Sequence, residues 1–168
     1  YDSDGNIILD NRGKEAHQVV KSSTAFLLAG AMEDVVTKGT GTATRFDRNM
    51  GIAGKTGSTT GYVDVWFAGF TPYYTCSAWA GYDNNHKMIS SGANQETNIA
   101  KSIWRNVMKS IHEDLPDKSF EVPTGIMEAE ICKLSGKLPN PDICDPACIV
   151  TEYFEEDTIP LELCDVHY

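Results

Sequence analysis

Ile52–Thr60 reads IAGKTGSTT, and after a short turn Asp64–Pro72 reads DVWFAGFTP. These two stretches and a third, Thr75–Tyr82, are short and rich in aromatic and β-branched residues. Gly and Pro separate them at Thr59-Thr60-Gly61 and at Thr71-Pro72. We therefore predict strands over 51–58, 63–70 and 75–82, joined as an antiparallel meander.

A helix is expected on each side of this meander. Before it, Ser22, Ser23 or Thr24 is a candidate N-cap for a helix that runs to about Lys38, with Gly39 as its stop. After it, helical spacing returns between about Gln95 and Glu113, with Asn94 as the candidate N-cap. In this second helix, apolar side chains recur every four residues at Ile99, Ile103, Val107 and Ile111. We expect this stripe to pack against the sheet together with Trp104 and Met108.

The expected fold class is thus α+β, an antiparallel sheet flanked by helices. At the N-terminus, Tyr1–Asp10 is predicted to form a short hairpin with Asp4-Gly5 as its turn.

Composition divides the chain in two. The 168 residues are 41% hydrophobic, enough for a core, and carry a net charge of −10, which argues against nucleic acid as a partner. Residues 1–116 hold 11 basic and 12 acidic side chains, whereas residues 117–168 hold 3 and 12. We therefore predict two segments, 1–116 and an acidic extension, 117–168.

The longest apolar stretch, Ala25–Met32, has eight residues, too few to span a membrane. Tyr1–Asp4 has neither the basic start nor the apolar segment of a secretory signal. If the protein is exported or anchored, we expect the responsible element to lie outside this chain.

The chemistry of the motif follows from its residue types. Lys55 on a strand would present a positive charge to a carboxylate or assist proton transfer, while Gly57 lets a substrate backbone approach closely. A phosphate loop is the alternative for Gly54-Lys55-Thr56. It requires a Gly where this chain has Asn49.

Several stretches together carry a family resemblance. Thr40-Gly41, Ala53–Gly57 (AGKTG), Asp64–Pro72 and Trp79–Asp83 (WAGYD) resemble the C-terminal half of the transpeptidase domain of class A, bifunctional penicillin-binding proteins. In that family, Lys-Thr-Gly accompanies a Ser-x-x-Lys motif and a Ser-x-Asn motif. Three later stretches are similar to the tail that these proteins often carry: Ile131–Gly136, Glu152–Phe154 and Pro160–His167.

The resemblance implies a D-alanyl-D-alanine transpeptidase of peptidoglycan synthesis that penicillins acylate, with no cofactor. Lys55 would be the motif lysine, and Thr56 and Ser58 would hold the substrate's terminal carboxylate. The backbone N–H of Ser58 would be one oxyanion donor, and Gly57 would leave room for the substrate. Many members have Thr at the position of Ser58, but the hydroxyl is kept. The implied partners are stem peptides and β-lactam antibiotics, at the extracytoplasmic face of the bacterial cell membrane.

One element of the family pattern is missing, because no Ser in the chain has a Lys three positions after it. We therefore expect the nucleophile on an N-terminal portion of the same protein, and expect this chain alone to be inactive. Two alternatives remain open: a fragment of a class A β-lactamase-like hydrolase, and a non-catalytic module that binds or senses the cell wall.

Four of the five cysteines fall in the acidic extension: Cys132, Cys144, Cys148 and Cys164. Disulfides are our leading interpretation, since a small segment with little core gains most from covalent links. Their connectivity is undetermined. A zinc site is the alternative, because Cys144 and Cys148 are close in sequence and Cys164 and His167 offer a second ligand pair.

Overall fold

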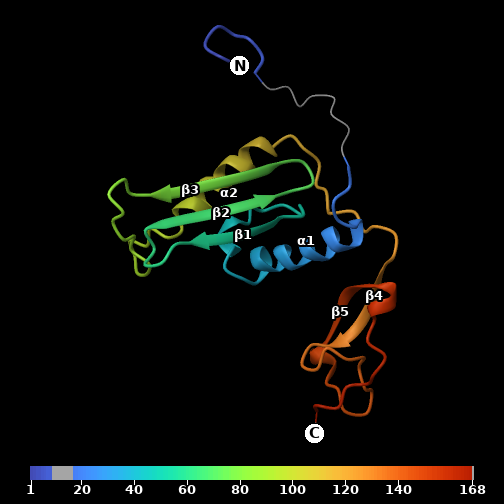
Figure 1. The fold of residues 1–168 in the computed structure, drawn as a ribbon. Helices are drawn as coiled ribbons and strands as arrows, with labels where there is room; N and C mark the ends of the chain where they lie inside the picture. The colour runs from blue at the N-terminus through green and yellow to red at the C-terminus, as the bar shows by residue number, and fades with distance from the viewer. Residues whose placement is uncertain (9–16, 168) are drawn as a thin grey trace.

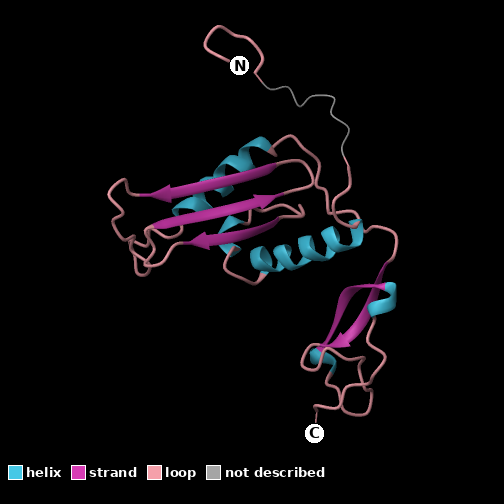
Figure 2. Cartoon of the chain, viewed as in Figure 1, coloured by secondary structure: helices cyan, strands magenta, loops and turns pink. Residues whose placement is uncertain are grey.

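The computed structural model describes residues 1–8 and 17–167 of the chain. It has an α+β fold with two separate antiparallel sheets (Figure 1 and Figure 2). In chain order its helices, strands and 3₁₀ turns are α1 (Ser22–Thr37), η1 (Thr42–Thr44), β1 (Ala53–Ser58), β2 (Asp64–Phe70), β3 (Thr75–Gly81), α2 (Ile99–Ile111), β4 (Ile126–Cys132), η2 (Pro146–Cys148), β5 (Ile149–Glu155) and η3 (Glu156–Thr158).

The first sheet is the predicted meander. Its strands follow the order β1-β2-β3, with both neighbouring pairs antiparallel, so β1 and β3 are its outer strands. In the register, Lys55 lies opposite Ala68, and Ser58 lies opposite Val65. Each strand lies within two residues of its predicted bounds, because aromatic and β-branched runs between Gly and Pro turns are a local signal.

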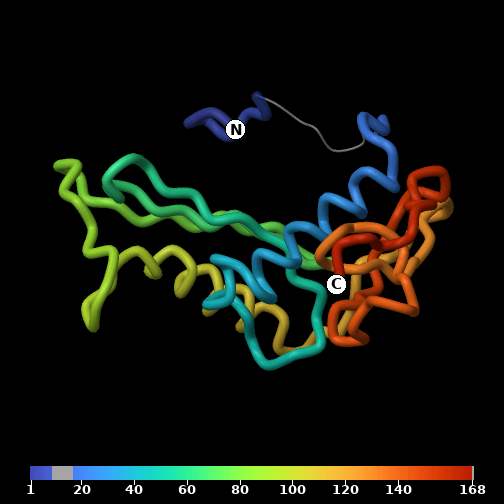
Figure 3. Tube along the Cα trace, turned by 90° about the horizontal axis from the view of Figure 1, so that it is seen from below, coloured from blue at the N-terminus to red at the C-terminus, as the bar shows by residue number. Residues whose placement is uncertain are grey.

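Helix α2 covers one face of this sheet, and Figure 3 shows it running along the strands. Trp104 of α2 and Phe67 of β2 are both 0% exposed, and their rings meet edge to face at 5.1 Å. The indole Nε1 of Trp104 donates a hydrogen bond of 2.9 Å to the carbonyl oxygen of Cys76 in β3. Met108, one turn further along, is also fully buried. These contacts join α2 to β2 and β3.

The predicted packing of the isoleucine stripe is wrong. Its four members, between 39% and 46% exposed, lie on the outer side of α2: Ile99, Ile103, Val107 and Ile111. The buried residues are Ala100, Trp104 and Met108, which follow the stripe by one position. Helix α2 carries two adjoining apolar stripes, and the sheet covers only the one that includes the large indole.

The predicted helix caps also differ from the structure. Lys21 is the N-cap of α1, so Ser22 already lies inside the helix, where its hydroxyl receives a hydrogen bond from Gln18 Nε2. The N-cap of α2 is Asn98 rather than Asn94. Neither observed N-cap makes a side-chain hydrogen bond to its helix, so the capping preference of the residue types did not decide where these helices begin.

The N-terminal hairpin is described only in part. Within residues 1–8 the chain makes a turn, closed by a hydrogen bond from Asp2 N to Asn6 O, and contains no strand. Residues 9 and 10 of the predicted hairpin lie outside the described residues.

The second sheet is the hairpin of β4 and β5, with Ile126 opposite Glu155 and Cys132 opposite Ile149. It lies beside α1. The ring centroids of Phe26 and Tyr153 are 5.1 Å apart, and the hydroxyl of Ser23 donates a hydrogen bond to the carboxylate of Glu155.

The connection before β4 packs on the first segment. Arg48 Nε lies 2.7 Å from Asp117 Oδ1, Gly51 N donates to Lys118 O, and the ring of Phe120 lies 5.4 Å from that of Phe70. Residues 117–120, which composition groups with the acidic extension, therefore contact the larger unit. None of the described helices is long and apolar enough to cross a membrane.

Candidate functional site

The Lys-Thr-Gly motif lies on β1, an outer strand. Within the described residues β1 pairs only with β2, so one side of its backbone is free of strand pairing. Because successive side chains alternate between the two faces, Thr56 and Ser58 lie on the face of Phe67 and Val65, which α2 covers. Lys55 lies on the opposite face, is exposed, and donates from Nζ to the carbonyl oxygen of Thr56 at 3.0 Å.

Gly54 is the residue that lets β1 approach β2 closely. A Cβ atom at this position would lie 2.4 Å from Phe67 Cζ and 3.0 Å from the carbonyl oxygen of Ala68. Non-bonded carbon atoms prefer about 3.5–4.0 Å, so only glycine fits beneath the Phe67 ring. The residue before the motif lysine thus sets the depth at which the motif sits against the core.

A groove of about 290 Å³ runs along the motif between β1, the loop before it and the start of α2. Its lining is mainly hydroxyl, amide and ammonium groups with two aromatic side chains: Thr40, Thr56, Gly57, Ser58, Tyr62, Trp66, Ser90, Gln95, Thr97 and Lys101. Such donors suit an anionic group at the end of a short peptide that lies along the open strand.

Two contacts organise the floor of the groove. The hydroxyl oxygens of Thr40 and Thr56 lie 2.9 Å apart, and Lys101 Nζ donates to the carbonyl oxygen of Thr40 at 3.2 Å. Burial lowers the pKa of the Lys101 ammonium. The loop that precedes β1 is thereby linked both to the motif and to α2.

The turn between β1 and β2 is held by Asp64. Its backbone N–H donates to Thr59 Oγ1 at 2.9 Å, and its carboxylate accepts from Trp79 Nε1 at 3.0 Å. Tyr62, with a positive φ of 58°, lies in this turn and lines the groove.

Of the predicted site residues, Thr56, Gly57 and Ser58 line the groove, whereas Lys55 is not among its lining residues. Most of the remaining lining lies outside the predicted motif. Thr40 belongs to a stretch that carries the family resemblance, whereas Tyr62 and Lys101 belong to no motif in the sequence. Lys101 is a polar residue of an amphipathic helix, which by itself indicates only a solvated face. A wider hollow of about 450 Å³ between Phe46–Arg48 and the end of α2 contains no motif residue.

Comparison with known proteins decides the family. Residues 6–109 match the model of the penicillin binding protein transpeptidase domain, and residues 122–168 match that of the penicillin-binding protein 1A C-terminal domain. The chain belongs to the penicillin-binding protein transpeptidase family.

Its relatives agree along nearly the whole chain. Penicillin-binding protein 1A of Clostridium tetani is 35% identical over 99% of this chain and 21% of its own length. That of Clostridium perfringens (strain ATCC 13124) is 33% identical over 99% of this chain and 20% of its own length. The chain thus spans about a fifth of these relatives.

A solved structure confirms the predicted fold class. The 2.6 Å crystal structure of penicillin-binding protein 1A from Haemophilus influenzae superposes with a TM-score of 0.70 at 25% identity, covering 87% of this chain and 22% of that one. The predicted α+β fold of a penicillin-binding transpeptidase is therefore correct.

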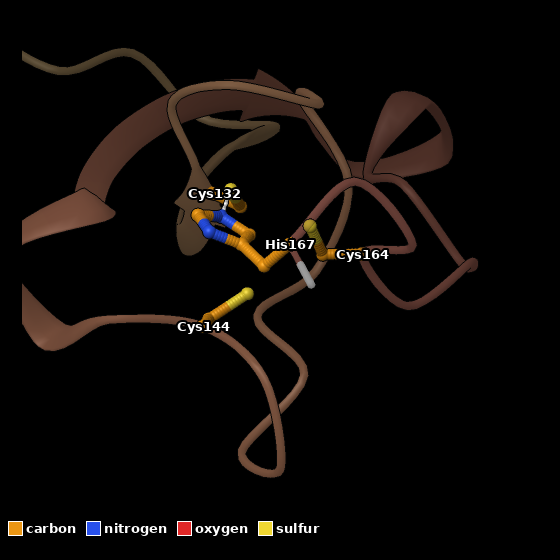
Figure 4. Close-up of side chains that lie close together, drawn as sticks. All are labelled: Cys132, Cys144, Cys164 and His167. Atoms are coloured by element: carbon orange, nitrogen blue, oxygen red, sulfur yellow. Dashed lines mark hydrogen bonds between the residues drawn. The ribbon is translucent and has the colours of Figure 1, made fainter.

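A second group of reactive side chains lies in the segment that matches the penicillin-binding protein 1A C-terminal domain. One ligand atom each from Cys132, Cys144, Cys164 and His167 lies within 4.8 Å of the other three (Figure 4). All five cysteines have free thiols in this structure, and Cys148 is outside the group. Burial raises the pKa of Cys132, but hydrogen bonds from His167 and from backbone N–H groups outweigh it and lower the pKa to about 5.

Proposed function

We propose that this chain supplies the Lys-Thr-Gly part of a D-alanyl-D-alanine transpeptidase of peptidoglycan synthesis that is acylated by penicillins. The observation that carries the proposal is the polar groove along β1, an outer strand bearing the motif. A stem peptide would extend the sheet along the open side of β1, with its terminal carboxylate among the groove hydroxyls.

Each motif residue has a role in this proposal. Lys55, on the strand face opposite to that of Thr56 and Ser58, contributes positive charge and hydrogen bonding around the site. Thr56 and Ser58, both lining the groove, bind the terminal carboxylate through their hydroxyls, and the backbone N–H of Ser58 is one oxyanion donor. Gly57 keeps the strand surface low. A Cβ atom there would come within 3.3 Å of Trp66 Cβ.

The reaction is acyl transfer through a serine. The serine oxygen attacks the penultimate D-Ala carbonyl, the terminal D-Ala departs, and the amine of a neighbouring stem peptide then displaces the serine from the acyl-enzyme. Because no Ser in this chain precedes a Lys by three positions, we assign the nucleophile to an N-terminal portion of the same protein.

The outer stripe of α2 supports that assignment, since its four exposed aliphatic side chains form an apolar surface of the kind that another part of a protein covers. The proposed location is the extracytoplasmic face of the bacterial membrane, with the anchor outside this chain. Isolated, the chain should form no covalent adduct with penicillin.

The test is Lys55→Ala in the full-length protein, with the rate of acylation by a fluorescent penicillin as the readout. We expect acylation to slow by at least about tenfold, because a positioned charge is lost from the site. Lys38→Ala is the matched control. It removes the exposed lysine that follows the last residue of α1 and pairs with Asp34, and it should leave the rate unchanged. Unchanged acylation in a folded Lys55→Ala protein would reject the assignment. Rapid release of hydrolysed penicillin, instead of a stable adduct, would favour a β-lactamase.

A further inference from the structure

Four metal-ligating side chains converge at the end of the molecule that is remote from the groove. Cys132 ends β4, Cys144 lies in the following loop, and Cys164 and His167 lie in the last described residues. Figure 4 shows their side chains pointing toward a common centre. Their ligand atoms lie within 4.8 Å of one another, and Cys132 Sγ lies 3.1 Å from His167 Nε2.

These separations are close to those of a tetrahedral metal site. With bonds of about 2.3 Å to sulfur and about 2.0–2.1 Å to nitrogen, zinc places its ligand atoms about 3.5–3.8 Å apart. Shifts of about an ångström or less at the side chains would bring this cluster to that geometry.

Backbone hydrogen bonds hold the ligands in place without any metal. Cys132 N donates to Lys137 O and Gly136 N to Cys132 O, both at 2.8 Å, in a turn where Gly136 has a φ of +70°. Cys164 N donates to Leu138 O, also at 2.8 Å, so the last segment lies beside that turn.

The loop that carries Cys144 is fixed by Asn140. Its backbone N–H donates to Cys144 Sγ at 3.3 Å, and its side-chain amide donates to the carbonyl oxygen of Cys164 at 3.3 Å. Asn140 thus donates to the sulfur of one candidate ligand and holds the segment of another. Residues that orient the ligands in this way are typical of the outer shell of metal sites.

The extension has almost no other core. Among residues 117–167 only Cys132 and Cys164 are buried, at 0% and 2% exposed. With so little buried apolar surface, the segment gains stability from a covalent or metal link, and the side chains at its centre are metal ligands rather than aliphatic groups.

Disulfides account for this arrangement less well. Three cysteines lie together, so any single bond among them leaves the third thiol and the imidazole without a partner. A second disulfide would need Cys148, which is outside the cluster. Cys148 lies next to Ile149, the strand partner of Cys132. A metal ion would be bound by all four groups at once.

We propose that Cys132, Cys144, Cys164 and His167 bind one structural zinc ion. Three thiolates and one imidazole in a tetrahedral arrangement favour Zn²⁺ over metals that prefer oxygen ligands or square-planar geometry. The closed set of four protein ligands indicates a structural role. The site is independent of the transpeptidase proposal, since it uses none of the groove residues.

The test uses the full-length protein, prepared with a reducing agent and Zn²⁺ and then desalted. We expect one zinc per chain by elemental analysis. Cys144→Ser and Cys164→Ser should lose it, whereas the matched control Cys148→Ser should keep it. Replacing Zn²⁺ by Co²⁺ should give the intense visible bands of a tetrahedral site and a thiolate-to-cobalt charge-transfer band.

A conservative exchange separates ligation from a merely structural role. His167→Cys should still bind one Co²⁺, and its charge-transfer band should grow by about one third because a fourth thiolate joins three. The proposal is overturned if the reduced chain holds no zinc, if Cys148→Ser loses zinc as Cys144→Ser does, or if the band of His167→Cys is unchanged. It is equally overturned if peptide mapping of unreduced protein finds a disulfide within the cluster.

Discussion

Gly54→Ala should destabilise the fold by overpacking the contact between β1 and β2. The added Cβ would lie 2.4 Å from Phe67 Cζ, 2.9 Å from Cε1 and 3.0 Å from Ala68 O. Because carbon atoms in contact prefer about 3.5–4.0 Å, the ring or the strand must move by about 1 Å or more.

Neither partner moves easily. The Phe67 ring is fully buried against Trp104, and the Trp104 indole is hydrogen bonded to the Cys76 carbonyl. Overpacking of a dense core typically costs about 1–3 kcal/mol. For a chain of 168 residues, each kcal/mol lowers the melting temperature by about 2–4 °C.

Thermal unfolding followed by circular dichroism measures this cost. Gly30→Ala is the matched control. A Cβ atom there meets nothing within 4 Å, so alanine should be neutral or should stabilise α1 by about 0.5–1 kcal/mol. Phe67→Leu removes the clashing ring atoms, so the double variant Gly54→Ala with Phe67→Leu should be more stable than the sum of the single changes by about 1 kcal/mol. A Gly54→Ala protein as stable as the wild type, or strict additivity in the double variant, would refute the reasoning.

Two further predictions follow from the contacts of the loops. Truncation of the full-length protein after Glu121 should leave penicillin acylation nearly intact, whereas truncation after Pro116 also removes the ring contact of Phe120 with Phe70 and should melt several degrees lower; equal melting temperatures would show that this contact contributes nothing. The Glu96 carboxylate accepts from the Tyr82 hydroxyl at 2.6 Å, and this bond, with one from a backbone N–H, lowers the pKa of Glu96 below its ordinary value of 4.5. The contribution of the ionised Glu96 carboxylate to folding stability is therefore present above pH 4.5 and is lost as the pH falls through the lowered pKa. Protection factors of the amides in the loop 82–96, which correct for the intrinsic pH dependence of exchange, should fall over that range and should lose this pH dependence in Glu96→Gln; a carboxyl that titrates at or above 4.5 by NMR would contradict it.

The groove illustrates what sequence can and cannot supply about a site. Lys55 to Ser58 are adjacent in the chain, so their residue types and strand pattern are enough to propose a binding edge. Thr40 and Lys101 are 61 residues apart and meet only because α2 folds back over the sheet. Nothing in their local sequence distinguishes them from solvated surface residues.

The cysteines show the same division. Sequence predicted that the acidic extension depends on links among its cysteines, but it could not choose the partners. The structure groups Cys132 with His167, which are 35 residues apart, and leaves Cys148 outside.

By itself the sequence determined the three strands of the meander, the two helices, the family and the motif on β1, because each depends on residue types within a few positions of one another. The tertiary structure alone decided which stripe of α2 is buried and which cysteines meet. These outcomes depend on how distant segments compete for the same surface: Trp104 and Met108 occupy the sheet face, and the stripe that begins at Ile99 is left outside it. No local pattern records that competition, because both stripes have helical spacing and both are apolar.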